Sequence, residues 1–298
     1  MIESPYCTLE NLLFFQVSAL GGFSFIDSIV SEHGCPLCFV ILFRFSVAFD
    51  AKVCYTIENS VTEERQIIMK IHFLGTGAAD WDPSLATADH NFRRLSSILV
   101  DDCLLVDPGP CLPEFVRTFA CPTLFTAPGL DAIVNTHRHS DHYCDAIVDW
   151  LGREKFVETP AWSHIETAHH KIDAYPAHHG TVKNAVHLVI ENKRDGKRFF
   201  YGCDGSFLYY ETAHALLGQH FDLMIFDGTI GDIPGEYRIF EHNNLPMVRE
   251  LQAAFAQNCP RFMISHLART LHPSHDEEAP ALAKEGIEVA YDNLVVQL

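Results

Sequence analysis

The segment that decides the fold is Thr136-His137-Arg138-His139-Ser140-Asp141-His142. It has the pattern HxHxDH, which places four metal-ligating residues within six positions. The segment follows an apolar run at 132–135 that predicts a strand, and it is expected to open a helix over 141–151. Imidazole and carboxylate ligands without thiolates suit zinc, manganese or iron at an open site. We predict that His137 and His139 bind one ion, and that Asp141 and His142 serve a second ion nearby.

Histidine is unusually frequent in this chain, and its positions are clustered. There are 18 histidines, and nine of them lie between residues 137 and 187. The hydrophobic fraction of 48% and charged fraction of 20% are those of a globular protein, which excludes collagen-like and disordered classes. The net charge of −18 disfavours a protein that holds nucleic acid by neutralising phosphates. Ten cysteines without regular spacing do not form a disulfide scaffold.

Residues 1–68 differ from the rest, because their apolar runs have neither alternating nor helical periodicity. Met69 opens directly into a strand pattern, and we expect residues 1–68 to be upstream sequence attached to the domain by a misassigned start codon. The CxxC spacing at 35–38 has no second pair and is not expected to bind metal. The extension has no basic residues ahead of its first apolar run, so a secretory signal is not expected. Cytoplasmic location is the default expectation.

Residues 69–298 alternate short apolar runs with amphipathic stretches, which predicts an α/β (α+β) domain of packed sheets with helices outside. Strands are expected at 71–74, 97–100, 104–106, 132–135, 186–190, 199–201, 223–226, 262–264, 288–290 and 294–296. Helices are expected at 141–151, 209–217, 246–256 and 276–284.

The HxHxDH motif resembles that of the metallo-β-lactamase superfamily, and residues 70–298 follow the superfamily's pattern in order. The resemblance implies a four-layer αββα sandwich with a dinuclear site at one edge. It also implies two divalent ions, zinc or manganese with iron as a third option. The further positions that it implies are Asp107 orienting a ligand histidine, His179 as a ligand in preference to adjacent His178, Asp204 bridging both ions, and His266 as the last ligand.

Two segments are similar to one branch of the superfamily. The Gly-rich run at 73–77 followed by Arg93-Arg94-Leu95-Ser96-Ser97 resembles the branch of tRNA 3′-processing endonucleases and cyclic-phosphate phosphodiesterases. Glu241-His242-Asn243-Asn244 is similar to the cyclic phosphodiesterase of the carbon–phosphorus lyase pathway. That subgroup uses a histidine outside the metal shell as general acid. Its cysteine-rich zinc insertion is missing from Ala78–Asn91, which argues against the same substrate.

The resemblance implies a metal-dependent hydrolase of small cyclic phosphodiesters, in which metal-bound hydroxide attacks the phosphorus. His242 and Asp141 are the expected catalytic residues, with His242 as general acid. The expected substrate-binding residues are Arg93, Arg94, Ser96 and His272, because arginines form charge-assisted hydrogen bonds with phosphate oxygens. The expected partner is a small phosphorylated substrate, with no nucleic acid and no membrane, and a homodimer is left open.

Three alternatives stay open at this point. A tRNA 3′-processing nuclease would need a basic arm, and none is found. A thioesterase shares the ligands but usually appends a helical domain after the last of them. A non-catalytic metal-binding sensor would hold the ions without turnover. The cysteines at 103, 111, 121, 144 and 203 have no paired metal spacing and are interpreted as small buried residues.

Overall fold

The structure is a computed structural model and describes residues 68–119 and 129–298. The predictions about the extension, the CxxC segment and Cys121 lie outside the described residues.

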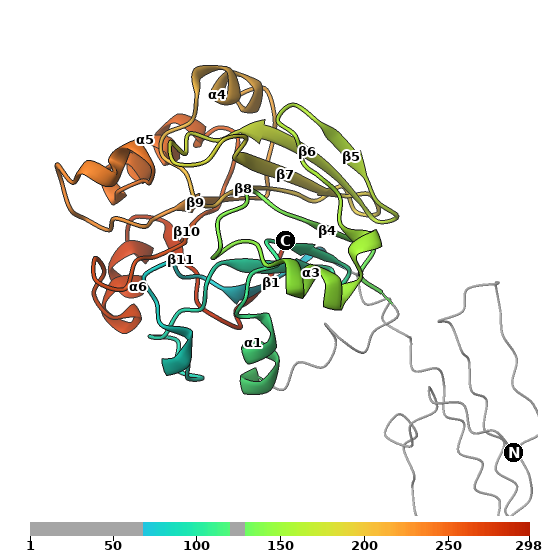
Figure 1. The fold of residues 1–298 in the computed structure, drawn as a ribbon. Helices are drawn as coiled ribbons and strands as arrows, with labels where there is room; N and C mark the ends of the chain where they lie inside the picture. The colour runs from blue at the N-terminus through green and yellow to red at the C-terminus, as the bar shows by residue number, and fades with distance from the viewer. Residues whose placement is uncertain (1–67, 120–128) are drawn as a thin grey trace, which may run out of the picture. The chain divides into compact units, whose positions relative to one another are not determined.

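The described part of the chain forms two sheets that face each other (Figure 1). The five-stranded sheet has the order β12-β1-β2-β3-β4, and the seven-stranded sheet has the order β11-β10-β9-β8-β7-β6-β5. The strands of the first sheet are β1 Lys70–Gly75, β2 Ser97–Val100, β3 Leu104–Val106, β4 Ala132–Val134 and β12 Val295–Gln297. Those of the second are β5 His164–Glu166, β6 His170–Pro176, β7 Val186–Asn192, β8 Arg198–Gly202, β9 Leu223–Asp227, β10 Phe262–Ser265 and β11 Ile287–Val289.

Alternation along each strand divides the apolar side chains between two faces. In β2, Ile98 and Val100 point into the core between the sheets, whereas Leu99 points outward. In β9, Ile225 points into the same core and Met224 points outward. Both faces of both sheets are therefore apolar, which explains why these strands are hydrophobic throughout.

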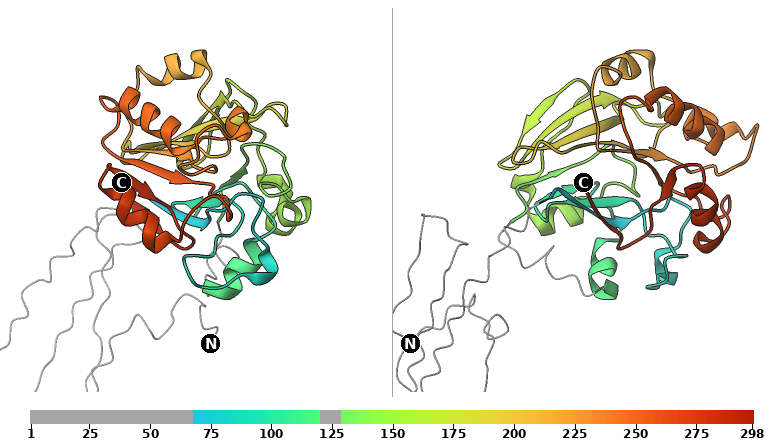
Figure 2. Two further views of the ribbon diagram at one scale, coloured as in Figure 1. Left: turned by 90° about the vertical axis from the view of Figure 1, so that its left-hand side faces the viewer. Right: turned by 180° about the vertical axis from the view of Figure 1, so that it is seen from behind.

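The outward faces are covered by helices, which completes the four-layer αββα sandwich that the sequence predicts (Figures 1 and 2). Helices α1 Leu112–Phe119 and α3 Asp145–Leu151 cover the five-stranded sheet. Helices α4 Tyr210–Leu216, α5 Leu245–Phe255 and α6 His275–Ala283 pack on the seven-stranded sheet. Short 3₁₀ turns are η2 Pro83–Leu85, η3 Arg153–Lys155 and η4 Tyr237–Phe240. None of the helices in the described ranges is long and apolar enough to cross a membrane.

The observed elements depart from the predicted ones in three places. The helix predicted at 141–151 begins only at Asp145, because the backbone N–H of Cys144 donates to the Pro108 carbonyl and the metal-binding motif stays in a turn. Strands β5 and β6 were not predicted, because buried His170 occupies one inward position of β6 and weakens the alternation. Helix α1 was also not predicted; its Pro113 lies in the first turn, where proline is tolerated.

Candidate metal centre

The predicted metal ligands come from loops that follow strands of both sheets. The HxHxDH segment lies in the loop after β4, with the other histidines and aspartates after β6, β8 and β10. The structure brings these residues together as His137, His139, Asp141, His142, His179, Asp204 and His266.

The first group of donors contains three histidines and one aspartate. The Nδ1 atom of His139 lies 3.0 Å from Nε2 of His137 and 3.0 Å from Nε2 of His179. The Oδ2 atom of Asp204 lies 3.1 Å from Nε2 of His137. Tetrahedral donors at zinc–ligand distances stand roughly 3.3 Å apart. The spacing of this group therefore fits one ion.

The second group shares Asp204 with the first. The Nε2 atom of His142 lies 3.2 Å from Nε2 of His266, 3.5 Å from Oδ2 of Asp141 and 3.4 Å from Oδ2 of Asp204. All four side chains are buried. Asp204 thus lies between two donor groups, as a bridging carboxylate would.

The chemistry of the donors fits divalent cations. His139 Nδ1 faces two other imidazole nitrogens at once, and one proton cannot satisfy both contacts. A cation at the centre of each group would satisfy these buried nitrogen and carboxylate atoms together. The residues present are thus suited to hold two metal ions.

A set of hydrogen bonds orients these donors from outside. The Asp107 carboxylate accepts from the backbone N–H of Thr136 at 2.7 Å and contacts Nδ1 of His142 at 3.0 Å. The hydroxyl of Thr229 contacts Nδ1 of His266 at 2.7 Å. Each contact occupies one ring nitrogen and directs the other toward the donor group, the usual arrangement for metal-binding histidines.

Backbone conformation at the strand ends is also unusual. Asp107, Asp204 and His266 have φ values of 59°, 56° and 59°, in the left-handed region that non-glycine residues rarely adopt. Asp107 and His266 directly follow their strands and Asp204 lies two positions beyond β8, so the chain turns sharply at these points and directs each side chain into the cluster. Strained backbone of this kind concentrates at functional sites.

His242 and Asp227 form a third part of the cluster. The Nδ1 atom of His242 lies 2.9 Å from Oδ2 of Asp227 and 3.1 Å from Oδ1 of Asp204. Burial opposes a charged ring, but the two carboxylates outweigh it and raise the pKa of His242 to about 11. Sequence reasoning missed Asp227, although its position at the end of β9 gave the same signal as Asp204.

Electrostatics favours an ionised Asp204. Burial alone would raise the pKa of its carboxyl group. The nearby His266 and hydrogen bonds from His137 and His142 oppose that effect and hold the pKa well below its usual value. The bridging position is therefore occupied by an anion, which is what two cations require.

The two adjacent histidines have different environments. His179 is 5% exposed and lies in the first donor group. His178 stacks on the ring of Tyr209, with the ring centroids 5.0 Å apart, and its carbonyl accepts from the backbone of Ser206. The structure therefore places His179, and not His178, among the donors.

The residues predicted to bind phosphate have structural contacts instead. The Arg94 side chain is fully buried, pairs with Glu114, and donates to Asp292 at 2.9 Å. Arg93 is 3% exposed and donates to the Ala290 carbonyl at 2.5 Å. These guanidinium groups satisfy buried acceptors within the fold, and their role as substrate contacts stays a prediction.

Ser96 and His272 are also engaged within the fold. The buried hydroxyl of Ser96 donates to the Gly77 carbonyl at 3.1 Å. The His272 side chain is 4% exposed, with Nδ1 at 2.6 Å from Glu278 and Nε2 at 2.7 Å from the Gly228 carbonyl. Both ring nitrogens of His272 are occupied, and the substrate-binding roles of Ser96 and His272 likewise stay predictions.

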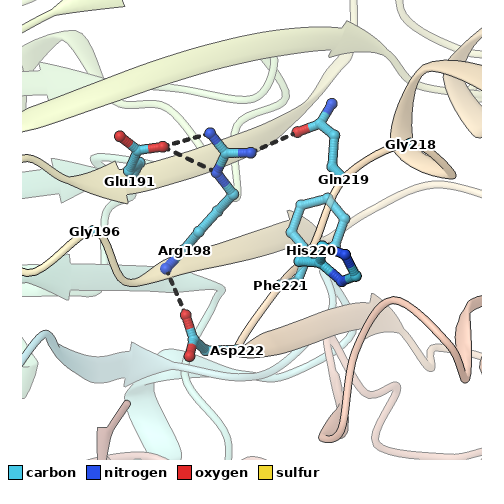
Figure 3. A pocket seen from close by; sticks show the side chains of 8 residues that line it. All are labelled: Glu191, Gly196, Arg198, Gly218, Gln219, His220, Phe221 and Asp222. Carbon is cyan, nitrogen blue, oxygen red and sulfur yellow. Dashed lines mark hydrogen bonds and ion pairs between the residues drawn. The ribbon is translucent and has the colours of Figure 1, made fainter.

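A surface pocket of about 440 Å³ lies away from the metal centre, at the amino end of β8 (Figure 3). Its polar groups contact one another: Arg198 pairs with Glu191 and donates to Gln219, and the backbone N–H of Arg198 donates to Asp222. Asp204 follows the opposite end of the same strand. The pocket therefore contributes nothing to the metal centre.

Comparison with known proteins supports the fold. No protein-family model matches the sequence, and no curated protein matches it. Among solved structures, the metallo-beta-lactamase fold protein YhfI from Bacillus subtilis is 16% identical, with a TM-score of 0.59 over 78% of this chain and 100% of YhfI. Zn²⁺-bound PqqB from Methylobacterium extorquens is 17% identical, with a TM-score of 0.57 over 77% of this chain and 100% of PqqB. The short form of human tRNase Z is 15% identical, with a TM-score of 0.52 over 76% of this chain and 98% of that protein. The described domain therefore has the metallo-β-lactamase fold.

Proposed function

We propose that this protein is a metal-dependent hydrolase that cleaves a small, cyclic or linear, phosphodiester. The observation that carries the proposal is the pair of buried donor groups that share Asp204, with His242 directly beside them. Two divalent ions, zinc or manganese, would lower the pKa of a bound water and polarise the bond under attack. The binding of a phosphorylated substrate, rather than a nucleic acid, is consistent with the net charge of −18.

The cluster residues divide into ligands and orienting groups. Asp204 serves both ions, and Asp141 belongs to the second ion's group. Asp107 and Thr229 direct the rings of His142 and His266 from the far side. The full set of proposed ligands is His137, His139, His179 and Asp204 for one ion, and Asp141, His142, Asp204 and His266 for the other.

His242 is the proposed general acid. Its Nδ1 is held by Asp227 and Asp204, while its Nε2 makes no hydrogen bond within the described residues. A phosphodiester leaves an alkoxide, which departs poorly unless it is protonated as the bond breaks. A positioned acid is typically worth ~10²–10⁴ in rate. Asp227 orients His242 and acts through it.

The test is turnover of a chromogenic phosphodiester and of a cyclic nucleotide by the full chain with added zinc or manganese. His242→Ala is expected to lower kcat by about 10²-fold or more while the bound metal remains. His220→Ala, a change at an exposed histidine beside the pocket in Figure 3, is the control and should leave kcat unchanged.

Two results would contradict the proposal. Metal-loaded protein that cleaves neither diester is not a phosphodiesterase, and cleavage of a thioester in the same assay would move the activity to another hydrolase class. Unchanged kcat in His242→Ala, with the diester still cleaved, would remove the general-acid role alone.

A further inference from the structure

A second cluster of metal-ligating side chains lies away from the metal centre. Cys103 directly precedes β3 and Asp131 directly precedes β4, which pair in parallel with Leu104 opposite Ala132. The backbone N–H of Asp131 donates to the Cys103 carbonyl at 2.7 Å, so the two side chains start from adjacent points. The turn between β5 and β6 brings His169 to the same place. Three distant segments thus converge there.

The cluster is separate from the centre already described. Cys103 and Asp107 flank the same short strand, four positions apart, and an extended chain of that length spans roughly 13 Å. Asp107 faces the metal centre, whereas Cys103 faces the other edge of the sandwich. An ion held at Cys103 would therefore be additional to the two proposed at the centre.

The geometry of the three donor atoms distinguishes a metal site from a catalytic thiol. The Cys103 Sγ lies 3.9 Å from Nδ1 of His169, and the Asp131 carboxylate contacts that same nitrogen. In a nucleophilic relay, the thiol and the acid would occupy opposite ring nitrogens. Convergence of sulfur, oxygen and nitrogen within 4.8 Å of one another is the arrangement of ligands around a shared cation.

We propose that Cys103, Asp131 and His169 bind a third divalent ion of the zinc type. Thiolate, imidazole and carboxylate are the donors that zinc prefers, and tetrahedral sulfur and nitrogen donors at zinc distances stand roughly 3.6 Å apart. Three protein donors leave one coordination position, which the exposure of His169 makes available to water.

The surrounding charge favours a cation. The carboxylates of Asp131, Asp101 and Asp102 all act on the Cys103 thiol and make the local field negative. The same negative field that opposes a bare thiolate attracts a divalent cation, and metal binding displaces the thiol proton.

The site would join the two sheets. Cys103 and Asp131 belong to the five-stranded sheet, and His169 leads into β6 of the seven-stranded sheet. A neighbouring contact already links the sheets there, since Asp101 Oδ2 lies 2.8 Å from Nε2 of His170. A bound ion would add a second link at the edge opposite the metal centre.

Cobalt titration of the full chain tests the site, because a thiolate ligand gives Co²⁺ a sulfur-to-metal charge-transfer absorption. The proposed ligands of the metal centre contain no sulfur, so they cannot produce this band. Cys35 and Cys38, outside the described residues, carry sulfur as well, so the decisive quantity is the change on Cys103→Ser. Cys144→Ser is the matched control, since Cys144 is also partly exposed and belongs to none of the donor groups.

We expect Cys103→Ser to lose the band and about one equivalent of bound metal, and Cys144→Ser to lose neither. His169→Ala should weaken cobalt binding at this band by about tenfold or more, whereas exposed His164→Ala should not. His137→Ala, at the metal centre, should keep the band, so the result does not depend on the proposed hydrolase activity. A wild-type protein without the band, or a band unchanged by Cys103→Ser, overturns the proposal.

Discussion

Strands β3 and β4 have side chains of the types that bind metals, or orient metal ligands, near both ends, but the two ends are built differently. At the carboxyl end, Asp107 and His137 are buried, and the hydroxyl of Thr136 contacts both the Asp107 carboxylate and Nδ1 of His137. At the amino end, Cys103 and Asp131 are partly exposed, and their partner His169 has a side chain that is 62% exposed. The same pair of strands thus presents an enclosed centre at one edge and an open cluster at the other.

This difference shows how burial changes the ways in which a polar donor atom can be satisfied. A buried donor cannot exchange its partner for water, so every polar atom near it must be satisfied by the protein or by an ion. An exposed donor can use water, and its loss costs the fold little. The two ends are therefore expected to respond very differently to the same kind of substitution.

The largest expected effect is the loss of a buried ion pair, and it tests whether burial determines how much stability such a loss removes. Arg94→Met removes the partner of Asp292, whose side chain is fully buried, and should lower the free energy of unfolding by about 3–5 kcal/mol. Arg153→Met is the control, because it breaks only solvent-exposed ion pairs with Asp145 and Asp149 and should leave the free energy of unfolding nearly unchanged. Urea unfolding measures both, and equal losses would break the comparison.

A pH experiment addresses a histidine packed beneath the enclosed end. Burial lowers the pKa of His187 to about 4, from 6.5, and neither ring nitrogen has a hydrogen-bond partner. The unfolded chain therefore binds the proton first. The neutral His187 ring therefore makes its full contribution to the free energy of unfolding above pH 6.5. That contribution falls as the pH drops toward 4, by roughly 3 kcal/mol at most. In His187→Leu, the free energy of unfolding should depend less on pH between 6.5 and 4 than it does in the wild-type protein. The same pH dependence in both proteins would contradict the expectation.

The next test makes one chemical change at each end. Asp107→Asn removes the carboxylate that orients His142 and should weaken metal binding at the enclosed centre by about 10–100-fold. Asp131→Asn should leave those ions in place and weaken only the cobalt band assigned to Cys103. Competition with a chelator measures the affinities, and a loss at both sites from either change would show that the two ends are coupled.

The smallest expected effect is at the open end without metal. His169→Ala breaks an exposed contact with Asp131, and in metal-free protein it should change the free energy of unfolding by about 1 kcal/mol or less. Thermal unfolding with and without zinc completes the test. A larger loss in the metal-free protein would mean that the contact, rather than an ion, holds the sheets together there.

The sequence predicts the strand ends around the enclosed centre, because Asp107, Asp204 and His266 lie just after apolar runs. The ends of such runs are strand ends, and the chain order of Asp107, Asp204 and His266 matches strands that the structure places in two facing sheets. The choice between His178 and His179 needed the loop geometry, since adjacent residues carry the same local pattern.

Other residues could not be predicted because their partners are remote in sequence. Arg94 pairs with Asp292, 198 positions away, and no local sequence pattern near either residue predicts the contact. Cys103, Asp131 and His169 each read as isolated surface or core residues, and only the pairing of β3 with β4 and the turn before β6 bring them together.

The pairing of β1 with β12 has a consequence for synthesis. Residues Lys70 and Gln297 are neighbours in the five-stranded sheet, and the buried partner of Arg94 precedes β12 by only a few positions. Until β12 is available, β1 has an open edge and Arg94 lacks Asp292, the more deeply buried of its two carboxylate partners. Contacts between such distant segments form slowly. The domain is thus expected to complete its folding only after β12 has emerged from the ribosome, with chaperones protecting the open edge until then.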